Sequence, residues 1–373
     1  RACSLRVRRS NGGSCTVPTY RPDLGSIPRY VAGRPIEDVA RELGIVSIDK
    51  LASNECPTEP FPEVIDAIAR AGAGVNRYPD SAQSELTNSI AAHHGLDAEA
   101  VWVAAGSSEI LRCTALSVGG PGTSAVFAHP SFVMYRIATL VAQSEPIGVP
   151  LDENFNHDLD AMLAAIRDDT TIVYLCNPNN PTGGIRSAKD VHAFDAVHEQ
   201  VIVVVDEAYA EYVTDSSYGS MIAMATTRPN VLVARTFSKI YGLAGLRVGY
   251  GIGHPELINT VRVTQPPFAV TSPAQAAGLE ALKQQERVSD RVASNAAGRE
   301  FLVGELTRRG FQVAPTQANF VYFEPESDAS GLFDALLHKG VIIRVLGAGV
   351  RVTVGTEPEN QRFLDALDTV ERS

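Results

Sequence analysis

The chain has 373 residues, of which 45% are hydrophobic and 20% are charged, and its formal net charge is −11 at pH 7. This length is sufficient for two domains, and the composition is that of an ordinary globular protein rather than a fibrous or membrane-embedded one. The acidic balance argues against non-specific nucleic-acid binding, which depends on lysine and arginine, so we expect small molecules as partners and no nucleic acid.

The first sixteen residues differ from the rest of the chain. They contain Arg1, Arg6, Arg8 and Arg9 together with serines and glycines, but no acidic residue. Starts of this kind occur in transit peptides. We instead interpret residues 1–16 as an irregular or non-native arm and leave them out of the fold prediction.

Short apolar runs, separated by intervals of helix length, begin near residue 98. Such alternation indicates an α/β fold with a mostly parallel sheet and helices on both of its faces. In open sheets of this kind, functional sites lie beyond the carboxyl ends of the strands. The runs that we expect to form strands are 100–103, 123–127, 171–176, 201–205, 231–234 and 247–252.

The pattern changes after residue 252 and predicts a smaller α+β domain. A long polar stretch of helical character runs from about 273 to 309. Beyond it we expect strands at 318–323, 341–345 and 349–354, and helices at 331–339 and 358–370. The predicted division is an arm at 1–16, a segment at 17–50 that joins the small domain, a large domain at 51–260 and the small domain at 261–373.

Polar residues follow the predicted strands in a distinctive order. One strand leads into a turn rich in Asn and Pro that contains Asn180, and the next strand ends at Asp206. Lys239 comes 33 residues after Asp206, and Arg247 comes eight residues after Lys239. Each residue alone has an ordinary explanation, such as a solvated lysine or an aspartate at the start of a helix. Their order is more specific, and a lysine set among small residues suits a Schiff base with a carbonyl compound.

With these residues in this order, the sequence resembles the fold-type-I pyridoxal-phosphate enzymes, and within them the histidinol-phosphate and aromatic aminotransferase group. The resemblance runs from about Tyr20 to the end of the chain. It is carried by the motifs Asn-Pro-Thr-Gly at 180–183, Asp-Glu-Ala-Tyr at 206–209, Ser-Lys at 238–239 and Gly-Leu-Arg at 245–247. Further matching segments lie at 51–55, 76–80, 106–109, 318–321 and 350–355.

The resemblance implies an aspartate-aminotransferase-like fold, in which the large domain holds a mostly parallel seven-stranded sheet flanked by helices. It also implies pyridoxal 5′-phosphate as cofactor, and transamination between a small-molecule amino donor and a 2-oxo acid. By the same resemblance, Lys239, Asp206 and Tyr209 are catalytic. Asp206 keeps the ring nitrogen protonated, and Asn180 and Tyr209 bind the phenolic oxygen of the cofactor. Lys239 forms the Schiff base and then acts as general base and acid.

A phosphate group needs several hydrogen-bond donors. Residues 106–108 follow a predicted strand and open a predicted helix, where N–H groups and the helix dipole attract an anion. The resemblance adds Phe132 as a ring that stacks on the cofactor, and Tyr78 as a contact to the phosphate of the neighbouring subunit's cofactor, which implies a homodimer. The expected cofactor-binding residues are Gly106, Ser107, Ser108, Phe132, Asn180, Asp206, Tyr209, Thr236, Ser238, Lys239, Arg247 and Tyr78.

The anionic group of the substrate needs a cation of its own. By resemblance, Arg351 contacts the carboxylate or phosphate of the substrate, and Arg344 at the end of an apolar run is a candidate for a second contact. Tyr30 and Asn54 match positions that line the substrate pocket. All four are therefore expected to bind substrate.

The amino donor stays open between two compounds that both offer a flat ring, a primary amine and an anion. Phe132 and the short link between Arg344 and Arg351 favour an aromatic amino acid such as phenylalanine, whereas Met-Tyr at 134–135 favours histidinol phosphate. We favour histidinol phosphate, and with it a place in histidine biosynthesis. A decarboxylase or lyase of the same fold is the alternative from another reaction class, because the bond set perpendicular to the cofactor ring decides the reaction.

Other function classes fit the sequence less well. The glycines at 249–253 lack the G-x-G-x-x-G spacing of nicotinamide-dependent dehydrogenases, and no Walker-type loop occurs. His93 and His94 are adjacent and no H-E-x-x-H motif occurs, so we expect no metal site. The acidic charge argues against a transcription regulator with an aminotransferase-like domain.

Cysteine usage and hydropathy indicate the compartment. The five cysteines form no C-x-x-C pair and leave an odd number, so neither a zinc site nor a disulfide framework is expected. No apolar run approaches the roughly 20 residues that a membrane helix needs. A cytoplasmic protein without membrane contact is therefore the expectation.

Overall fold

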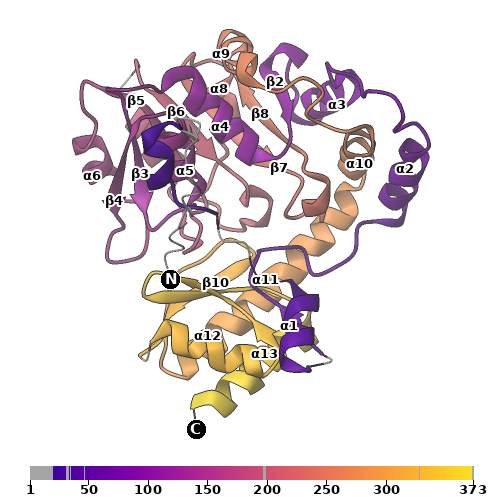
Figure 1. Ribbon diagram of the computed structural model, residues 1–373, viewed down its shortest axis with the longest axis vertical. Helices are drawn as coiled ribbons and strands as arrows, with labels where there is room; N and C mark the ends of the chain where they lie inside the picture. The colour runs from indigo at the N-terminus through magenta and orange to yellow at the C-terminus, as the bar shows by residue number, and fades with distance from the viewer. Residues whose placement is uncertain are drawn as a thin grey trace, which may run out of the picture.

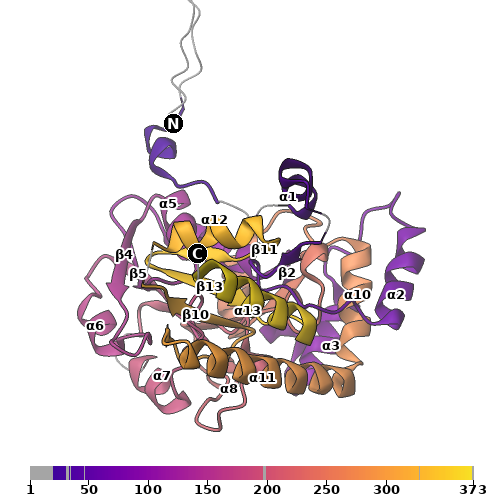
Figure 2. The same ribbon diagram turned by 90° about the horizontal axis from the view of Figure 1, so that it is seen from below.

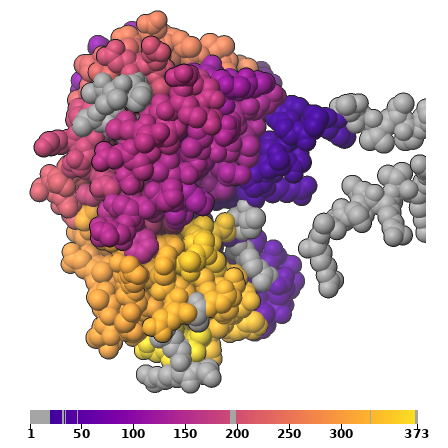
Figure 3. Space-filling view, turned by 90° about the vertical axis from the view of Figure 1, so that its left-hand side faces the viewer, coloured from indigo at the N-terminus to yellow at the C-terminus, as the bar shows by residue number. Residues whose placement is uncertain are grey.

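The computed structural model describes residues 20–371 except 31, 32, 34, 46, 196–198 and 327, so the predicted arm at 1–16 lies outside the described residues. The described chain forms a large body around a seven-stranded sheet and a small body that contains the C-terminal strands (Figure 1). In Figure 3 the small body, orange to yellow, lies below the magenta large body. None of the described helices combines the length with the apolar character that crossing a membrane requires.

The large sheet has the strand order β2-β8-β7-β6-β5-β3-β4. Neighbouring strands run parallel except at β8, which is antiparallel to both β2 and β7. The predicted α/β fold with a mostly parallel seven-stranded sheet is therefore confirmed. The strands are β2 (Val101–Ala104), β3 (Ser124–His129), β4 (Glu145–Pro150), β5 (Thr170–Cys176), β6 (Ile202–Asp206), β7 (Val231–Thr236) and β8 (Gly249–Gly253).

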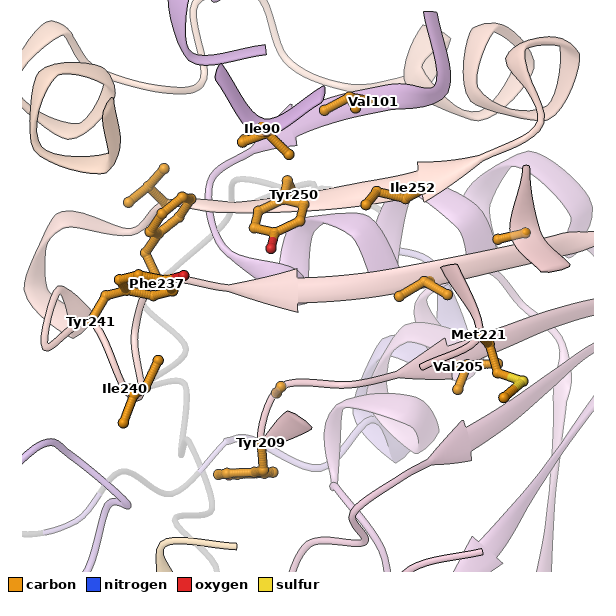
Figure 4. Close-up of a cluster of buried hydrophobic side chains, with 14 of the residues drawn as sticks. Ile90, Val101, Val205, Tyr209, Met221, Phe237, Ile240, Tyr241, Tyr250 and Ile252 are labelled. Carbon is orange, nitrogen blue, oxygen red and sulfur yellow. The ribbon is translucent and has the colours of Figure 1, made fainter. Parts of the chain in front are cut away.

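Alternate residues of these strands face two separate hydrophobic cores, because successive side chains of a strand point to opposite faces. On β6, Val203 and Val205 belong to one core and Val204 to the other. The Val204 core is covered by α4 (Ser107–Val118), α5 (Met134–Val141) and α9 (Pro255–Val261). The Val205 core, part of which Figure 4 shows, is covered by α2 (Pro62–Gly72), α3 (Ser84–His94), α6 (Leu159–Ala164), α7 (Ala188–Asp195), α8 (Ile222–Ala225) and α10 (Ser272–Leu282).

The small body is built on an antiparallel sheet with the order β12-β13-β10-β9. Its elements are α11 (Gln285–Arg308), β9 (Gln312–Val313), β10 (Phe320–Glu324), α12 (Ala329–His338), β12 (Arg344–Leu346), β13 (Gly349–Thr353) and α13 (Glu357–Glu371). Figure 2, in which this body faces the viewer, shows α12 and α13 in front of its strands.

The segment before the large body joins the small one. β1 (Asp49–Lys50) pairs in parallel with β11 (Val341–Ile342). Val39 of α1 (Ile36–Leu43) packs with Leu337 and Ile342 of the small body. Val39 and residues 49–50 therefore contact the small body, whereas Arg21, earlier in the same predicted segment, contacts the large body, since its Nη2 donates to the Val141 carbonyl of α5 at 3.3 Å.

The polar stretch predicted as helical from 273 to 309 consists of two helices, α10 and α11, separated by Lys283 and Gln284. Ala274 and Ala277 of α10 belong to the core of the large sheet, whereas Leu302 of α11 belongs to the core of the small body. The chain therefore passes from one body to the other along α11, which runs between them in Figure 1.

Candidate active site

A cavity of about 440 Å³ lies where the two bodies meet. Asp206 and Thr236, which end β6 and β7, contribute to its wall, so it lies at the carboxyl edge of the sheet as expected for this architecture. The sequence-predicted residues that line it are Tyr30, Asn54, Ser107, Ser108, Phe132, Asn180, Asp206, Tyr209, Thr236, Ser238, Lys239, Arg247, Arg344 and Arg351. Residues far apart in the sequence thus share one site.

Lys239 follows the end of β7 in a segment that Phe237 anchors in the core. The Phe237 ring packs against Tyr250, with 5.6 Å between the ring centroids (Figure 4). The half-buried Lys239 side chain faces the cavity, where its Nζ donates to the Ser53 carbonyl oxygen at 3.4 Å. Burial, reinforced by the charge of Arg351, lowers the pKa of Lys239 to about 8. A fraction of this amine is therefore neutral and nucleophilic near physiological pH.

Asp206 is a buried carboxylate at the cavity wall, with 2% of its surface exposed. Both of its oxygens accept hydrogen bonds. The Tyr135 hydroxyl donates to Oδ2 at 2.9 Å, and the Ala208 N–H donates to Oδ1 at 3.2 Å. Burial raises the pKa of Asp206 to about 6, although the two donors and the charge of Lys239 lower it. Asp206 is consequently mostly ionised at neutral pH.

The hydroxyl of Tyr209 accepts hydrogen bonds from two amides. Asn54 Nδ2 donates to it at 2.9 Å and Asn180 Nδ2 at 3.3 Å. Burial raises the pKa of Tyr209, so the phenol keeps its hydrogen, which remains available for an acceptor in the cavity. The small body holds Asn54 in place, because Thr353 Oγ1 accepts from its N–H at 2.9 Å.

An anion-binding corner forms where α4 begins. Gly106, directly before α4, has φ 83° and ψ 164°, a conformation that is essentially restricted to glycine. The first N–H groups of a helix have no acceptor within it, and the helix dipole adds positive charge. A Cβ atom on Gly106 would lie 2.6 Å from Nη2 of Arg247, whose Nη1 donates to Ser238 Oγ at 3.3 Å. N–H groups, a hydroxyl and a guanidinium therefore converge as a phosphate requires.

Arg344 and Arg351 bring two like charges to the cavity from adjacent strands, where they occupy directly opposite positions. Arg351 is buried; its Nη2 donates to the Ala52 carbonyl at 2.7 Å and its Nη1 to Asn180 Oδ1. Its Nε has no hydrogen-bond partner among the described residues. Burial lowers the pKa of Arg351 to about 10, and the nearby Arg344 contributes to the lowering. Because like charges directly opposite destabilise a sheet, this pair suits a strongly anionic ligand.

Two of the residues predicted for the site do not line the cavity. Gly106 lies behind Arg247 and acts through its lack of a side chain. Tyr78 stands apart, with 81% of its surface exposed. Its ring stacks on Phe268, with 4.6 Å between centroids and 22° between planes. A single chain therefore does not bring Tyr78 to Lys239.

Two features of the site were missed from the sequence. The first is the contact of Tyr135 with Asp206, since the sequence analysis used Tyr135 only as part of the Met-Tyr pair. The signal that could have found this contact is the need of a buried Asp206 for a donor. The second is the ion pair between Arg235 and Glu207, both buried, with Nη2 2.7 Å from Oε2. Since Arg235 lies on β7 and Glu207 directly follows β6, this pair clamps the strand ends that carry Asp206 and Lys239.

Comparisons with known proteins agree with this geometry. Residues 47–367 match the family model described as aminotransferase class I and II. The chain is 42% identical over 359 residues to the histidinol-phosphate aminotransferase of Moorella thermoacetica, covering 94% of this chain and 93% of the relative. It is also 42% identical over 354 residues to the aromatic amino acid aminotransferase of Thermobifida fusca, covering 94% and 97%.

A solved structure is similar over nearly its whole length. The histidinol-phosphate aminotransferase from Sinorhizobium meliloti, in complex with pyridoxal 5′-phosphate, superposes with a TM-score of 0.89 at 27% sequence identity. The match covers 96% of this chain and 99% of that chain. The large sheet, the small body and the cavity between them thus belong to an architecture already known from solved proteins.

Proposed function

The chain belongs to the class I and II aminotransferase family, and we propose that it transfers the amino group of histidinol phosphate to 2-oxoglutarate as a step of histidine biosynthesis. The proposed cofactor is pyridoxal 5′-phosphate, as in the complex of the Sinorhizobium meliloti relative. Three features support this proposal: the fit of the cavity to the cofactor, the state of Lys239, and the paired arginines.

The residues of the cavity fit the cofactor. The corner at Gly106 is the most direct observation, because a side chain there would displace the Arg247 guanidinium from the start of α4, where the phosphate would be held. Asp206 is a buried carboxylate of the kind that keeps a ring nitrogen protonated. The Tyr209 hydroxyl offers its hydrogen to the phenolic oxygen, and Phe132 offers a ring for stacking. When bound, the cofactor supplies an electron sink for bonds at the amine-bearing carbon.

With the cofactor present, Lys239 would hold it covalently, and when freed from it the Lys239 amine would act as the proton carrier. Its lowered pKa places a neutral Nζ at the cavity near physiological pH, so this atom can accept a proton from the amine-bearing carbon of the substrate. The same Nζ would then donate that proton to the carbon of the cofactor and not back to the substrate carbon, because return to the substrate would only regenerate the amino donor. Asp206 retains the proton on the ring nitrogen meanwhile, because its charge is buried.

The single observation that carries the choice of substrate is the pairing of Arg344 opposite Arg351. Two cations held directly opposite each other at the cavity, of which Arg351 is buried and Arg344 half-buried, are well neutralised by a dianion. The phosphate of histidinol phosphate is a dianion at neutral pH, whereas phenylalanine offers one carboxylate. We therefore propose that these two arginines bind the substrate phosphate, with Tyr30 and Asn54 lining the same pocket.

The test compares kcat/KM for histidinol phosphate and for phenylalanine, each with 2-oxoglutarate, in the natural chain and in Arg344→Gln. Loss of one charge-assisted contact of about 1.5–3 kcal/mol should lower kcat/KM for histidinol phosphate about 10–100-fold. The value for phenylalanine should fall much less. Arg308→Gln is the matched control, because that arginine is exposed on α11 and pairs with Glu305.

The opposite outcome favours the second candidate. A strong preference for phenylalanine in the natural chain would overturn the substrate proposal and favour an aromatic amino acid aminotransferase, which the relative from Thermobifida fusca supports. Release of carbon dioxide or ammonia during a single turnover would instead contradict transamination and favour a decarboxylase or lyase.

We further propose that the active form is a homodimer in which Tyr78 completes the site of the neighbouring subunit. The exposed stack of Tyr78 on Phe268 supports this arrangement, because such a pair gains from being covered by a second chain. A chain that sediments as a monomer while fully active would contradict it.

A further inference from the structure

We propose that the hydroxyl of Tyr135 is a positioning group for Asp206, which keeps the carboxylate ionised and directed at the cavity. The inference rests on the proposed function, because it concerns the carboxylate that would pair with the ring nitrogen of the cofactor. Tyr135 is absent from the residues that line the cavity and has no exposed surface. It therefore acts on the site through the cavity residues that it contacts, and among these its hydroxyl donates to Asp206.

The contact between Tyr135 and Asp206 is buried and geometrically fixed. The hydroxyl donates to Oδ2 at 2.9 Å. The ring of Tyr174 stacks on that of Tyr135, with 4.8 Å between centroids and 12° between planes. The ring of Phe132 meets it edge-on, at 5.8 Å and 89°. Because two rings pack against it, the Tyr135 side chain has a fixed orientation, and in that orientation its hydroxyl points at the Asp206 carboxylate.

A single turn of the chain carries both Phe132, which lines the cavity, and Tyr135, which donates to Asp206 from behind it. The N–H of Tyr135 donates to the Phe132 carbonyl at 3.1 Å. Phe132 lines the cavity, and Tyr135, three residues later, reaches Asp206 from the core side. A buried tyrosine hydroxyl usually needs some acceptor. Here the acceptor is the carboxylate on which the chemistry of the site depends.

The other titratable or charged groups that face Asp206 come from β5, from the segment after β6 and from the segment after β7. They are Cys176, Glu207, Tyr209 and Lys239. Burial raises the pKa values of the Cys176 thiol and the Tyr209 phenol, so both stay neutral near pH 7. Glu207 is paired with Arg235 at 2.7 Å. Tyr135 is accordingly the neutral side chain that donates directly to the Asp206 charge.

A hydrogen bond from a neutral donor stabilises a carboxylate relative to the carboxylic acid. Removal of the Tyr135 hydroxyl should therefore raise the pKa of Asp206 further. A protonated Asp206 cannot pair with a protonated ring nitrogen, so binding of the cofactor ring should weaken at a higher pH than in the natural chain.

The experiment uses cofactor-free protein and pyridoxamine 5′-phosphate, which has no aldehyde and so binds without forming a bond to Lys239. Its dissociation constant is measured from pH 5 to pH 9 by fluorescence. In the natural chain, affinity should fall as the pH drops through about 6, the pKa of Asp206. In Tyr135→Phe the midpoint should move up by about one to two pH units. Contributions from the ligand and from Lys239 are the same in both proteins and cancel in the comparison.

Two control variants isolate the effect. Tyr174→Phe deletes a buried hydroxyl in the neighbouring ring, which has no hydrogen bond to Asp206 within the described part of the chain, and it should leave the midpoint unchanged. In the Asp206→Asn background, Tyr135→Phe should no longer move the midpoint, because what remains of the pH dependence comes from the ligand and Lys239. If Tyr135→Phe still moves it there, or if Tyr135→Phe and Tyr174→Phe both match the natural chain, the inference is overturned.

The remaining outcomes are also decisive. A Tyr135→Phe chain that no longer folds, as judged by circular dichroism, would give the hydroxyl a structural role and overturn the inference. Failure of the proposed function looks different, because the natural chain itself would then not bind pyridoxamine 5′-phosphate at any pH. That result would remove both proposals together.

Discussion

Gly106→Ala tests the proposal that the corner before α4 holds a phosphate. Gly106 has φ 83° and ψ 164°, and a side chain in this region costs about 1–3 kcal/mol of stability. The added Cβ would also lie 2.6 Å from Nη2 of Arg247, well inside normal contact. Because the guanidinium is the flexible partner, we expect it to move away from the start of α4.

Both effects are measurable. Loss of one charge-assisted hydrogen bond to a phosphate, worth about 1.5–3 kcal/mol, should weaken binding of pyridoxamine 5′-phosphate about 10–100-fold. The free energy of unfolding of the cofactor-free chain, measured in urea, should fall by about 1–3 kcal/mol. Fluorescence titration and urea unfolding of the same protein preparation separate the two effects.

Gly245→Ala is the matched control for this change. Gly245 lies two residues before Arg247, and a Cβ there would meet nothing within 4 Å. This variant should bind the ligand and unfold like the natural chain. If Gly106→Ala and Gly245→Ala behave alike in both measurements, the close approach of Gly106 to Arg247 has no role in anion binding.

Two further predictions concern Lys239. Lys239→Ala should keep its circular dichroism spectrum but lose the visible absorbance of bound cofactor and all turnover, because the cavity loses its amine; persistent turnover would refute the assignment. Lys239→Met should raise the unfolding temperature of the cofactor-free chain below about pH 8, since burial disfavours the ammonium in the folded state. That gain should shrink between pH 8 and 10.5, where the amine of the natural chain becomes neutral in both states, and equal unfolding temperatures at pH 7 would contradict it.

The apolar runs of the sequence located every strand of the large sheet except β4. That strand, Glu145–Pro150, contains two prolines and a glycine, which argue against a strand in a sequence. It lies at the edge of the sheet, where a missing N–H leaves no neighbour unpaired on the open side. Position in the sheet, which no local pattern encodes, is what makes this strand possible.

The bounds of two other predicted strands differ from those in the structure, for local reasons. The run at 341–345 was predicted as one strand but forms β11 and β12, which belong to different sheets on either side of Ile343. The run at 247–252 was predicted to begin with Arg247, but β8 begins at Gly249 and Arg247 has a left-handed φ of 54°. This conformation takes Arg247 out of the strand and leaves its guanidinium beside Gly106.

Site residues that belong to sequence motifs could be predicted from the sequence. Contacts between side chains on different helices and strands were not predicted. Asp206, Lys239 and Arg351 were found because each lies in a recognisable segment of a known family. The hydrogen bond from Tyr135 to Asp206 spans 71 positions, and neither residue signals the other in the sequence. Contacts of this kind follow from the packing of α5 on the sheet, which only the folded chain reveals.

Three charged groups at the cavity have a common property: burial shifts the pKa of Asp206, Lys239 and Arg351 toward the neutral form of each. It raises the pKa of Asp206 to about 6, lowers that of Lys239 to about 8 and lowers that of Arg351 to about 10. A site in which both signs of charge are poorly solvated is destabilised until opposite charges enter it. A ligand with a cationic ring nitrogen and a substrate with an anionic group would relieve Asp206 and Arg351 respectively. Since a ligand that binds only the folded state stabilises it, occupancy of this cavity and the stability of the fold should rise together.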